Sequence, residues 1–263
     1  MPTTHRLSRI CTNVPGLLLS ALAVTLTCAA VGARADTLFG VYAGAGAWAP
    51  NPSGNASSGG SEVDLERDLN LGKKRNNLAY LRLEHGVPIL PNLRLNYTDV
   101  LTDGRNTLGR SIEFNDRQFL IAEQVSSKID LTQIDAVAYY EVLDNIVSLD
   151  LGLTARWFDG EVEIASESDV ARAEFTGVLP LLYARGELKL PFTGLWLGAE
   201  MQGIGYSGNR LLDGSAQFGW RSAFGLGAEV GWRMFELRLD DFDDIDSARM
   251  EFKGPYLALN YHF

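Results

Sequence analysis

The sequence contains two cysteines, Cys11 and Cys28, and both lie within its first 35 residues. The chain after residue 35 therefore offers no disulfide framework, no cysteine-ligated metal and no thiol nucleophile. Long apolar runs are missing as well, since no window after residue 35 holds the ~18 apolar residues that a membrane-spanning helix requires. These absences exclude a helical membrane protein and leave a strand-spanning one open.

The first 35 residues have the pattern of a secretory signal peptide. Arg6 and Arg9 give a basic start, an apolar stretch covers 17–26, and Ala33-Arg34-Ala35 has the small-x-small form of a cleavage site. We expect export through the Sec pathway and a mature chain of residues 36–263. The alternative, a lipoprotein that begins at Cys28, is less favoured because Thr27 is a poor residue before a lipidated cysteine.

Basic side chains are also in short supply. The leader holds three of the 23 basic residues and none of the 33 acidic ones, so the mature chain has 20 basic against 33 acidic side chains, a net charge of −13. Phosphate binding needs clustered lysine and arginine, so nucleic acid is not an expected partner.

What the mature chain does contain is a period of two in hydrophobicity. In the segment 146–159, Val147, Leu149, Leu151, Leu153, Ala155 and Trp157 alternate with Ser148, Asp150, Gly152, Thr154 and Arg156. Successive side chains of a strand point to opposite faces, so this segment has one apolar and one polar face. It is also longer than a usual strand and long enough for a tilted crossing of a bilayer.

The same pattern predicts ten strands, at about 37–48, 77–88, 93–102, 130–142, 146–159, 179–190, 195–206, 215–230, 234–240 and 249–263. Tight turns are expected at 88–92, 143–145, 191–194 and 231–233, and longer connections at 49–76, 103–129, 160–178, 207–214 and 241–248. An all-β, antiparallel up-and-down transmembrane β-barrel with short periplasmic turns and long external loops gives that alternation. Eight strands are the alternative, if the pieces around 215–240 merge and one other segment is demoted.

In a membrane barrel the apolar faces meet lipid and the polar faces line the lumen. The expected lumen charge network comprises Arg82, Glu84, Arg94, Asp150, Arg156, Arg185, Glu187, Glu200, Arg221, Glu229 and Arg238. A two-residue turn at 191–194 would place Arg185 opposite Glu200, and Glu84 with Arg94, like Glu229 with Arg238, would be diagonal neighbours. Because an open aqueous channel usually takes ~16–18 strands, ion pairs that fill the barrel are favoured over a charged pore.

Two further sets of residues are expected on the lipid face. Aromatic belts at the membrane surfaces would use Tyr97, Tyr140, Trp157, Trp220, Phe235, Tyr261 and Phe263. The chain ends on an alternating strand, in which Leu257, Leu259, Tyr261 and Phe263 resemble the signal read by the barrel-assembly machinery. The expected partners are therefore membrane lipid, lipopolysaccharide and that machinery, in the outer membrane of a Gram-negative bacterium.

Segments at 64–71, 83–97, 139–160, 180–200 and 239–263 resemble an uncharacterised family of proteobacterial outer-membrane β-barrel proteins. The P-x-L-P-N turn (Pro88 to Asn92) and the F-x-G-P-Y-L ending (Phe252 to Leu257) carry most of the resemblance. The stretch 84–88 departs from it, because the family has a proline directly after the histidine. The resemblance implies fold and location and brings no activity.

The sequence gives little sign of chemistry. His85 cannot use Glu84 as a partner, because adjacent strand residues face opposite ways, so no enzyme, cofactor or metal is expected. The acidic stretch 240–246 lacks the spacing of a calcium-binding loop. We expect a structural, adhesive or small-pore role; the alternatives are a membrane-embedded enzyme that modifies lipid or peptide, and a soluble periplasmic barrel of lipocalin type.

Overall fold

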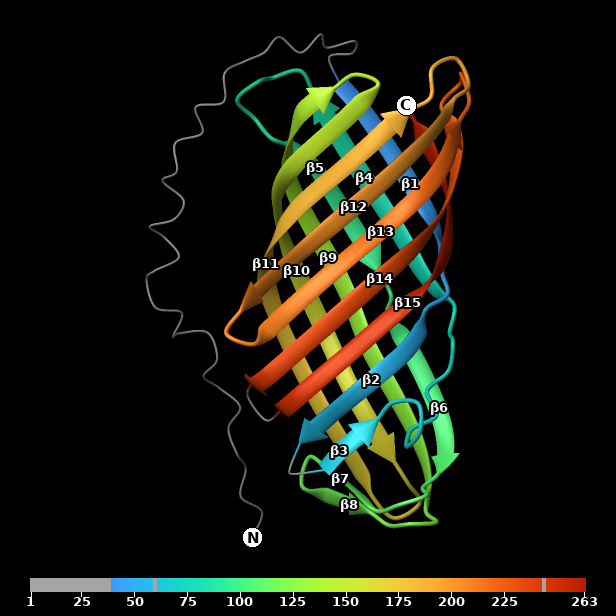
Figure 1. The fold of residues 1–263 in the computed structure, drawn as a ribbon, viewed down its shortest axis with the longest axis vertical. Helices are drawn as coiled ribbons and strands as arrows, with labels where there is room; N and C mark the ends of the chain where they lie inside the picture. Colours follow the sequence, from blue (N-terminus) through green and yellow to red (C-terminus); the bar gives the residue numbers. More distant parts are fainter. Residues whose placement is uncertain (1–38, 59–60, 243–244) are drawn as a thin grey trace. The chain divides into compact units, whose positions relative to one another are not determined.

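The computed structural model describes residues 39–58, 61–242 and 245–263, and the regular elements in these ranges are all β-strands (Figure 1). They are β1 (Phe39–Trp48), β2 (Asn51–Ser58), β3 (Ser61–Asp64), β4 (Asn76–His85), β5 (Asn92–Thr98), β6 (Leu101–Thr107), β7 (Ile112–Phe114), β8 (Arg117–Phe119), β9 (Gln124–Asp144), β10 (Val147–Ala165), β11 (Val170–Lys189), β12 (Leu195–Tyr206), β13 (Asn209–Arg221), β14 (Leu226–Phe242) and β15 (Ile245–His262). The predicted leader lies outside the described residues. Within them, no helix is long and apolar enough to cross a membrane.

Ten strands form a closed antiparallel barrel, in the order β1-β4-β5-β9-β10-β11-β12-β13-β14-β15, and β15 pairs again with β1. This confirms the predicted fold class and the count of ten; the eight-stranded alternative is wrong because all ten strands pair in one ring. Phe39 and Phe263 lie at one end, which we call the terminus end. The opposite end, with β2–β3 and β7–β8, is the loop end (Figure 1).

The turn predicted at 231–233 is wrong. Strand β14 runs without interruption from Leu226 to Phe242, and the turn before it covers 222–225, where Gly225 has a φ of 92°. The reason lies in the order of polar and apolar residues along β14. Before Met234 the apolar residues are the outward ones, such as Val230 and Trp232, and after it they are the inward ones, such as Phe235 and Leu237. A phase change in the sequence suggested two strands where the molecule has one.

Three predicted long connections at the loop end are also wrong. Residues 207–214 hold a two-residue turn, Ser207-Gly208, and the start of β13; a four-residue turn, 166–169, joins β10 to β11; and β14 and β15 continue to Phe242 and from Ile245. These polar segments pair with neighbouring strands as extensions of the barrel. The two remaining long connections contain β2 and β3, and β6 to β8.

The barrel wall has two zones of opposite polarity. In the polar-lumen zone, which comprises 133–144, 147–157, 226–234 and 255–262 of the long strands, apolar side chains face out and polar ones face in. In the apolar-core zone, 124–132, 158–165, 235–240 and 246–254, the arrangement is reversed. On β14, for example, Val230 and Trp232 are exposed and Arg233 faces in, whereas Phe235 is buried and Arg238 is exposed.

The interior of the apolar-core zone is a hydrophobic core of buried side chains. Phe158, Phe235 and Phe252 from three strands pack with ring centroids 6.4 and 6.0 Å apart. Trp48, the last residue of β1, joins this core, and the loop-end connections add further large buried residues: Leu65, Leu108, Ile112 and Phe119. Burial of one such side chain stabilises the fold by about 1.5–3 kcal/mol, so this zone is a substantial source of stability. Phe235 belongs to this core, and its predicted place in an aromatic belt is wrong.

Candidate functional site in the barrel interior

The layer of the lumen nearest the apolar core is built around Arg156. Its guanidinium makes a bidentate contact with Asp135, at 2.6 and 2.8 Å, and its Nη2 lies 2.9 Å from Asp213. Arg233 binds the same Asp213 at 2.7 and 2.9 Å and donates to Thr98 at 3.1 Å. Two arginines and two aspartates therefore compensate one another where Arg156 is fully buried.

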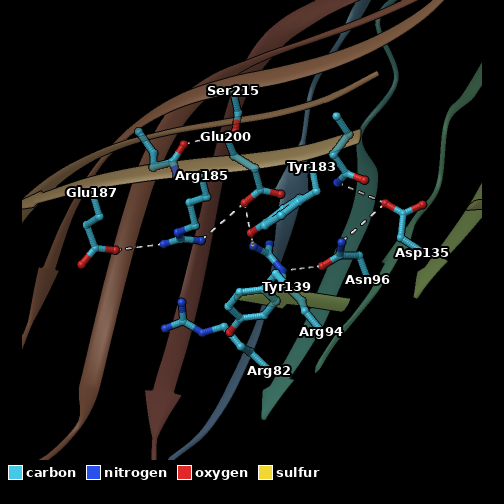
Figure 2. A network of polar contacts seen from close by, with 12 residues as sticks. Arg82, Arg94, Asn96, Asp135, Tyr139, Tyr183, Arg185, Glu187, Glu200 and Ser215 are labelled. Atoms are coloured by element: carbon cyan, nitrogen blue, oxygen red, sulfur yellow. Dashed lines mark hydrogen bonds and ion pairs between the residues drawn. The ribbon is translucent and has the colours of Figure 1, made fainter. Parts of the chain in front are cut away.

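The middle layer joins opposite sides of the lumen (Figure 2). Arg94, on β5, reaches Glu200, on β12, at 2.6 Å, and donates to Asn96 at 2.7 Å. Arg185 lies opposite Glu200 in the strand register, as the turn length predicted, and contacts both Glu200 at 3.4 Å and Glu187 at 3.0 Å. One carboxylate thus serves two guanidinium groups from different strands.

The layer nearest the terminus end combines ion pairs with aromatic rings. Arg82 contacts Glu84 at 3.2 Å, and its guanidinium carbon lies 4.0 Å from the ring centre of Tyr42. On β15, His262 stacks on Tyr42 with centroids 4.0 Å apart and planes 1° from parallel. Arg221 also lies near the Tyr42 ring, at 5.6 Å. These contacts join the first strand to the last at the closure of the barrel.

Ten of the eleven residues predicted for the lumen network point into the polar-lumen zone. Arg238 does not: it lies on the outer face of the apolar-core zone, where it pairs with Glu236. Glu229 and Arg238 are not diagonal neighbours, because both belong to β14. Glu84 and Arg94 are diagonal across β4 and β5, but their ion-pair partners are Arg82 and Glu200.

The network also contains residues that the sequence did not indicate. Asp213 and Arg233 lie in segments predicted as a loop and a turn. Asp135 lies in a predicted strand, 130–142, but is not part of the predicted network. The phase change of β14 was the available signal, because reading Phe235 and Leu237 as inward residues makes Arg233 inward too.

A cavity of about 70 Å³ in the polar lumen is bordered by Arg94, Asp135, Glu200, Asp213 and Arg233. A more open groove of about 470 Å³ lies at the terminus end, beside Trp196, Trp220 and Phe192. The 70 Å³ cavity is large enough for a few water molecules.

Both histidines among the described residues, His85 and His262, have defined contacts. His85 Nε2 lies 3.2 Å from the carbonyl oxygen of Pro91, and its Nδ1 accepts a hydrogen bond from the Val87 N–H, so His85 orders the turn between β4 and β5. His262 lies in the stack with Tyr42. In the described ranges, no group of three His, Cys, Asp or Glu side chains is placed to hold a metal ion; of the acidic stretch 240–246, residues 243 and 244 lie outside those ranges.

At the loop end, the connection between β3 and β4 is fixed by Asp68. Arg110 donates to its carboxylate at 2.6 and 3.2 Å, and the Asp64 N–H donates at 2.9 Å. Burial raises the pKa of the Asp68 carboxyl, but these hydrogen bonds outweigh burial, so the pKa lies below that of an ordinary aspartate. The ion pair holds the segment that carries Leu65 and Leu69 into the core.

Neither a protein-family model nor a curated protein matches this chain. Among solved structures, the chain is similar to the attachment invasion locus protein Ail of Yersinia pestis, solved with the heparin analogue sucrose octasulfate (11% identity, TM-score 0.34, 86% of this chain and 100% of that chain). It is also similar to the translocator domain of autotransporter NalP from Neisseria meningitidis (11%, TM-score 0.42, 88% and 90%) and to the transport unit of AIDA-I from Escherichia coli (10%, TM-score 0.35, 94% and 97%).

Proposed function

We propose that this protein is an integral outer-membrane β-barrel whose lumen is closed, and that it serves as a structural or adhesive platform at the cell surface. The terminus end would face the periplasm and the loop end the outside. The observation that carries the proposal is the reversal of polarity along the strands, with a charged lumen that stops at an apolar core.

The outer face of the polar-lumen zone supports a membrane location. On β10 the outward residues from Val147 to Trp157 are apolar, and the next outward residues are Asp159 and Glu161. Eleven residues of a tilted strand match the ~9–11 that cross a bilayer. A soluble barrel of lipocalin type would place this apolar face inward, so the arrangement argues against that alternative.

Closure of the lumen supports a platform rather than a pore. Ions moving from the terminus end would meet first the cross-lumen ion pairs and then the packed rings of Phe158, Phe235 and Phe252. Transfer of a charge into such an apolar medium is costly. The loop end, held together by its own core, would present a rigid surface.

The proposed partners follow from this location. Membrane lipid and lipopolysaccharide would surround the apolar outer face of the polar-lumen zone, which we call the apolar belt. The barrel-assembly machinery would read Leu257, Leu259, Tyr261 and Phe263, which all point outward and are exposed. Sec-dependent export would precede assembly. We further propose that the role is not catalytic, because the chemistry-bearing histidines serve a turn and a strand closure.

Planar-bilayer recording of the purified barrel tests the closed lumen. We expect no conductance steps from the wild-type protein, and steps from a variant in which Phe158, Phe235 and Phe252 are all replaced by Ser. Heat-modifiable migration on a gel and co-fractionation with outer membranes check the location. Stable wild-type conductance would contradict the closed barrel, and recovery in the soluble periplasmic fraction would contradict the membrane location.

A further inference from the structure

The barrel wall is split between β11 and β12 at the loop end. Pairing of these strands ends at Leu182 with Gly203, yet β11 continues for twelve more residues to Val170. Over residues 170–181, β11 pairs with β10 on one side, and no strand among the described residues pairs with its other edge. The β12–β13 hairpin stops at Tyr206 and Asn209, well short of the loop end (Figure 1).

Pro180 explains where the split begins. The carbonyl oxygen of Arg172 accepts a hydrogen bond from Asn115 and therefore points away from β10. Backbone groups of every second residue share a direction in an antiparallel strand, so residues 174, 176, 178 and 180 also present theirs to the free edge. Pro180 has no N–H to donate to β12, and pairing ends beside it.

The inner face confirms that the wall is open there. Leu179 points inward and is 37% exposed, whereas Leu131 on β9 and Phe252 on β15, also at inward positions, are 1% and 0% exposed. A Cβ on the inward-facing Gly177 would have no atom within 4 Å. Around Gly177 and Leu179, the described side chains therefore leave the lumen side of the free edge sparsely packed.

We propose that this edge is a docking site for an extended polypeptide segment, which adds a strand beside β11 over residues 173–178. Glu174, Thr176 and Val178 present N–H and C=O groups at the spacing of a strand, and no strand in the described part of the chain pairs with them. Only another extended backbone matches such groups in series. Its inward side chain beside Gly177 and Leu179 would be large and apolar.

The level of the edge favours a polypeptide over an acyl chain. Thr176 lies opposite Asp159 and Val178 opposite Trp157, the last apolar outward residue of β10. Most of the edge therefore lies above the apolar belt, where free backbone groups stay hydrated until a strand replaces the water. An acyl chain would leave these groups without partners. This docking site extends the proposed surface platform by giving it a class of partner. Peptide binding can be measured in detergent, so the test does not depend on the cellular location of the barrel.

The probe is a fluorescein-labelled peptide of about nine residues, alternating Thr and Val around a central Trp, added to the folded full-length protein in detergent. We expect saturable anisotropy binding, weakened about tenfold or more by Gly177→Trp, which fills the space beside the edge, and by Thr176→Pro, which removes an edge N–H. Gly109→Trp is the matched control, because Gly109 also has open space and lies off the edge. Heat-modifiable migration shows that each variant is folded.

Two N-methylated versions of the peptide complete the test. Each carries N-methyl groups on alternate residues, which remove the N–H donors along one edge of the extended peptide, and the two versions differ in which edge is blocked. One of the two should lose binding, because a docked strand uses a single edge. Equal binding of both, binding unchanged in folded Gly177→Trp, or no saturation by about 1 mM peptide would overturn the proposal. Self-association of the wild type that excludes the peptide would overturn it in favour of a second copy of the chain.

Discussion

Arg156 Nη2 and Asp213 Oδ2 lie 2.9 Å apart although they belong to β10 and β13, which are separated by two other strands. The contact crosses the lumen and links two strands that are not paired by backbone hydrogen bonds. Such cross-lumen pairs make the stability of the barrel depend on individual buried charges.

Arg156→Ala should therefore destabilise the barrel strongly. It leaves Asp135 buried without its bidentate partner, and breaking a buried pair typically costs about 3–5 kcal/mol. The measurement is urea unfolding of protein refolded into lipid vesicles, followed by tryptophan fluorescence.

Arg172→Ala is the control for Arg156→Ala. Arg172 pairs with Glu161 and Glu163 on the exposed outer face of the apolar-core zone. We expect its loss to cost less than about 1 kcal/mol, as for exposed ion pairs in general. Equal losses from the two variants would show that burial of the Arg156 network has no energetic role.

Acid should loosen the loop end through Asp68. The pKa of Asp68 is lower in the folded protein than in the unfolded chain, so its ion pair contributes stability above the usual aspartate range, and that contribution is lost as pH falls through the folded pKa. Hydrogen exchange of residues 64–72 should accelerate on going from pH 6 to about pH 3, after correction for intrinsic rates.

Asp68→Asn should remove this dependence on pH and exchange faster at both values. Glu66→Gln, an exposed neighbour, serves as the control and should behave as the wild type. A wild-type pH response that persists in Asp68→Asn would assign the effect to another group.

Gly219→Ala should strain the barrel wall. A Cβ at this position would lie 2.3 Å from the ring of Trp196, which crosses the glycine from the neighbouring strand. Overpacking of this kind costs about 1–3 kcal/mol, measurable by urea unfolding in vesicles.

Gly186→Ala is the matched control for Gly219→Ala, since its nearest atom would be 4.0 Å away. In a double-mutant cycle, Gly219→Ala should cost less stability in a Trp196→Leu background than it costs in the wild type. Additive effects in this double mutant would contradict a direct clash.

Deletion of Phe263 should impair assembly into the outer membrane and leave export and leader cleavage intact. Phe263 is exposed on the outer face and packs edge-on against Tyr261, with centroids 4.6 Å apart. Pulse-chase labelling, with heat-modifiable migration as the readout, separates cleaved but unassembled protein from folded barrel. Normal assembly of the deletion variant would remove Phe263 from the proposed signal.

Alternation and turn length by themselves determined the fold class, the number of strands and the register of the β11–β12 hairpin. A period of two shows which residues share a face, and a short turn sets the register of its hairpin, so the sequence alone places Arg185 opposite Glu200. These features are local and depend on few residues.

Tertiary structure decided whether the polar or the apolar set of side chains points inward at each level of the barrel. In the proposed membrane location, water replaces lipid above the apolar belt, so the favoured outward side chain changes from Trp232 to Arg238 while β14 continues unbroken. The sequence shows this only as a change of phase, which a turn would produce equally well. Contacts such as Arg156 with Asp213, and the free edge beside Pro180, depend on how the closed wall brings distant strands together or leaves them apart, and local alternation carries no information about that.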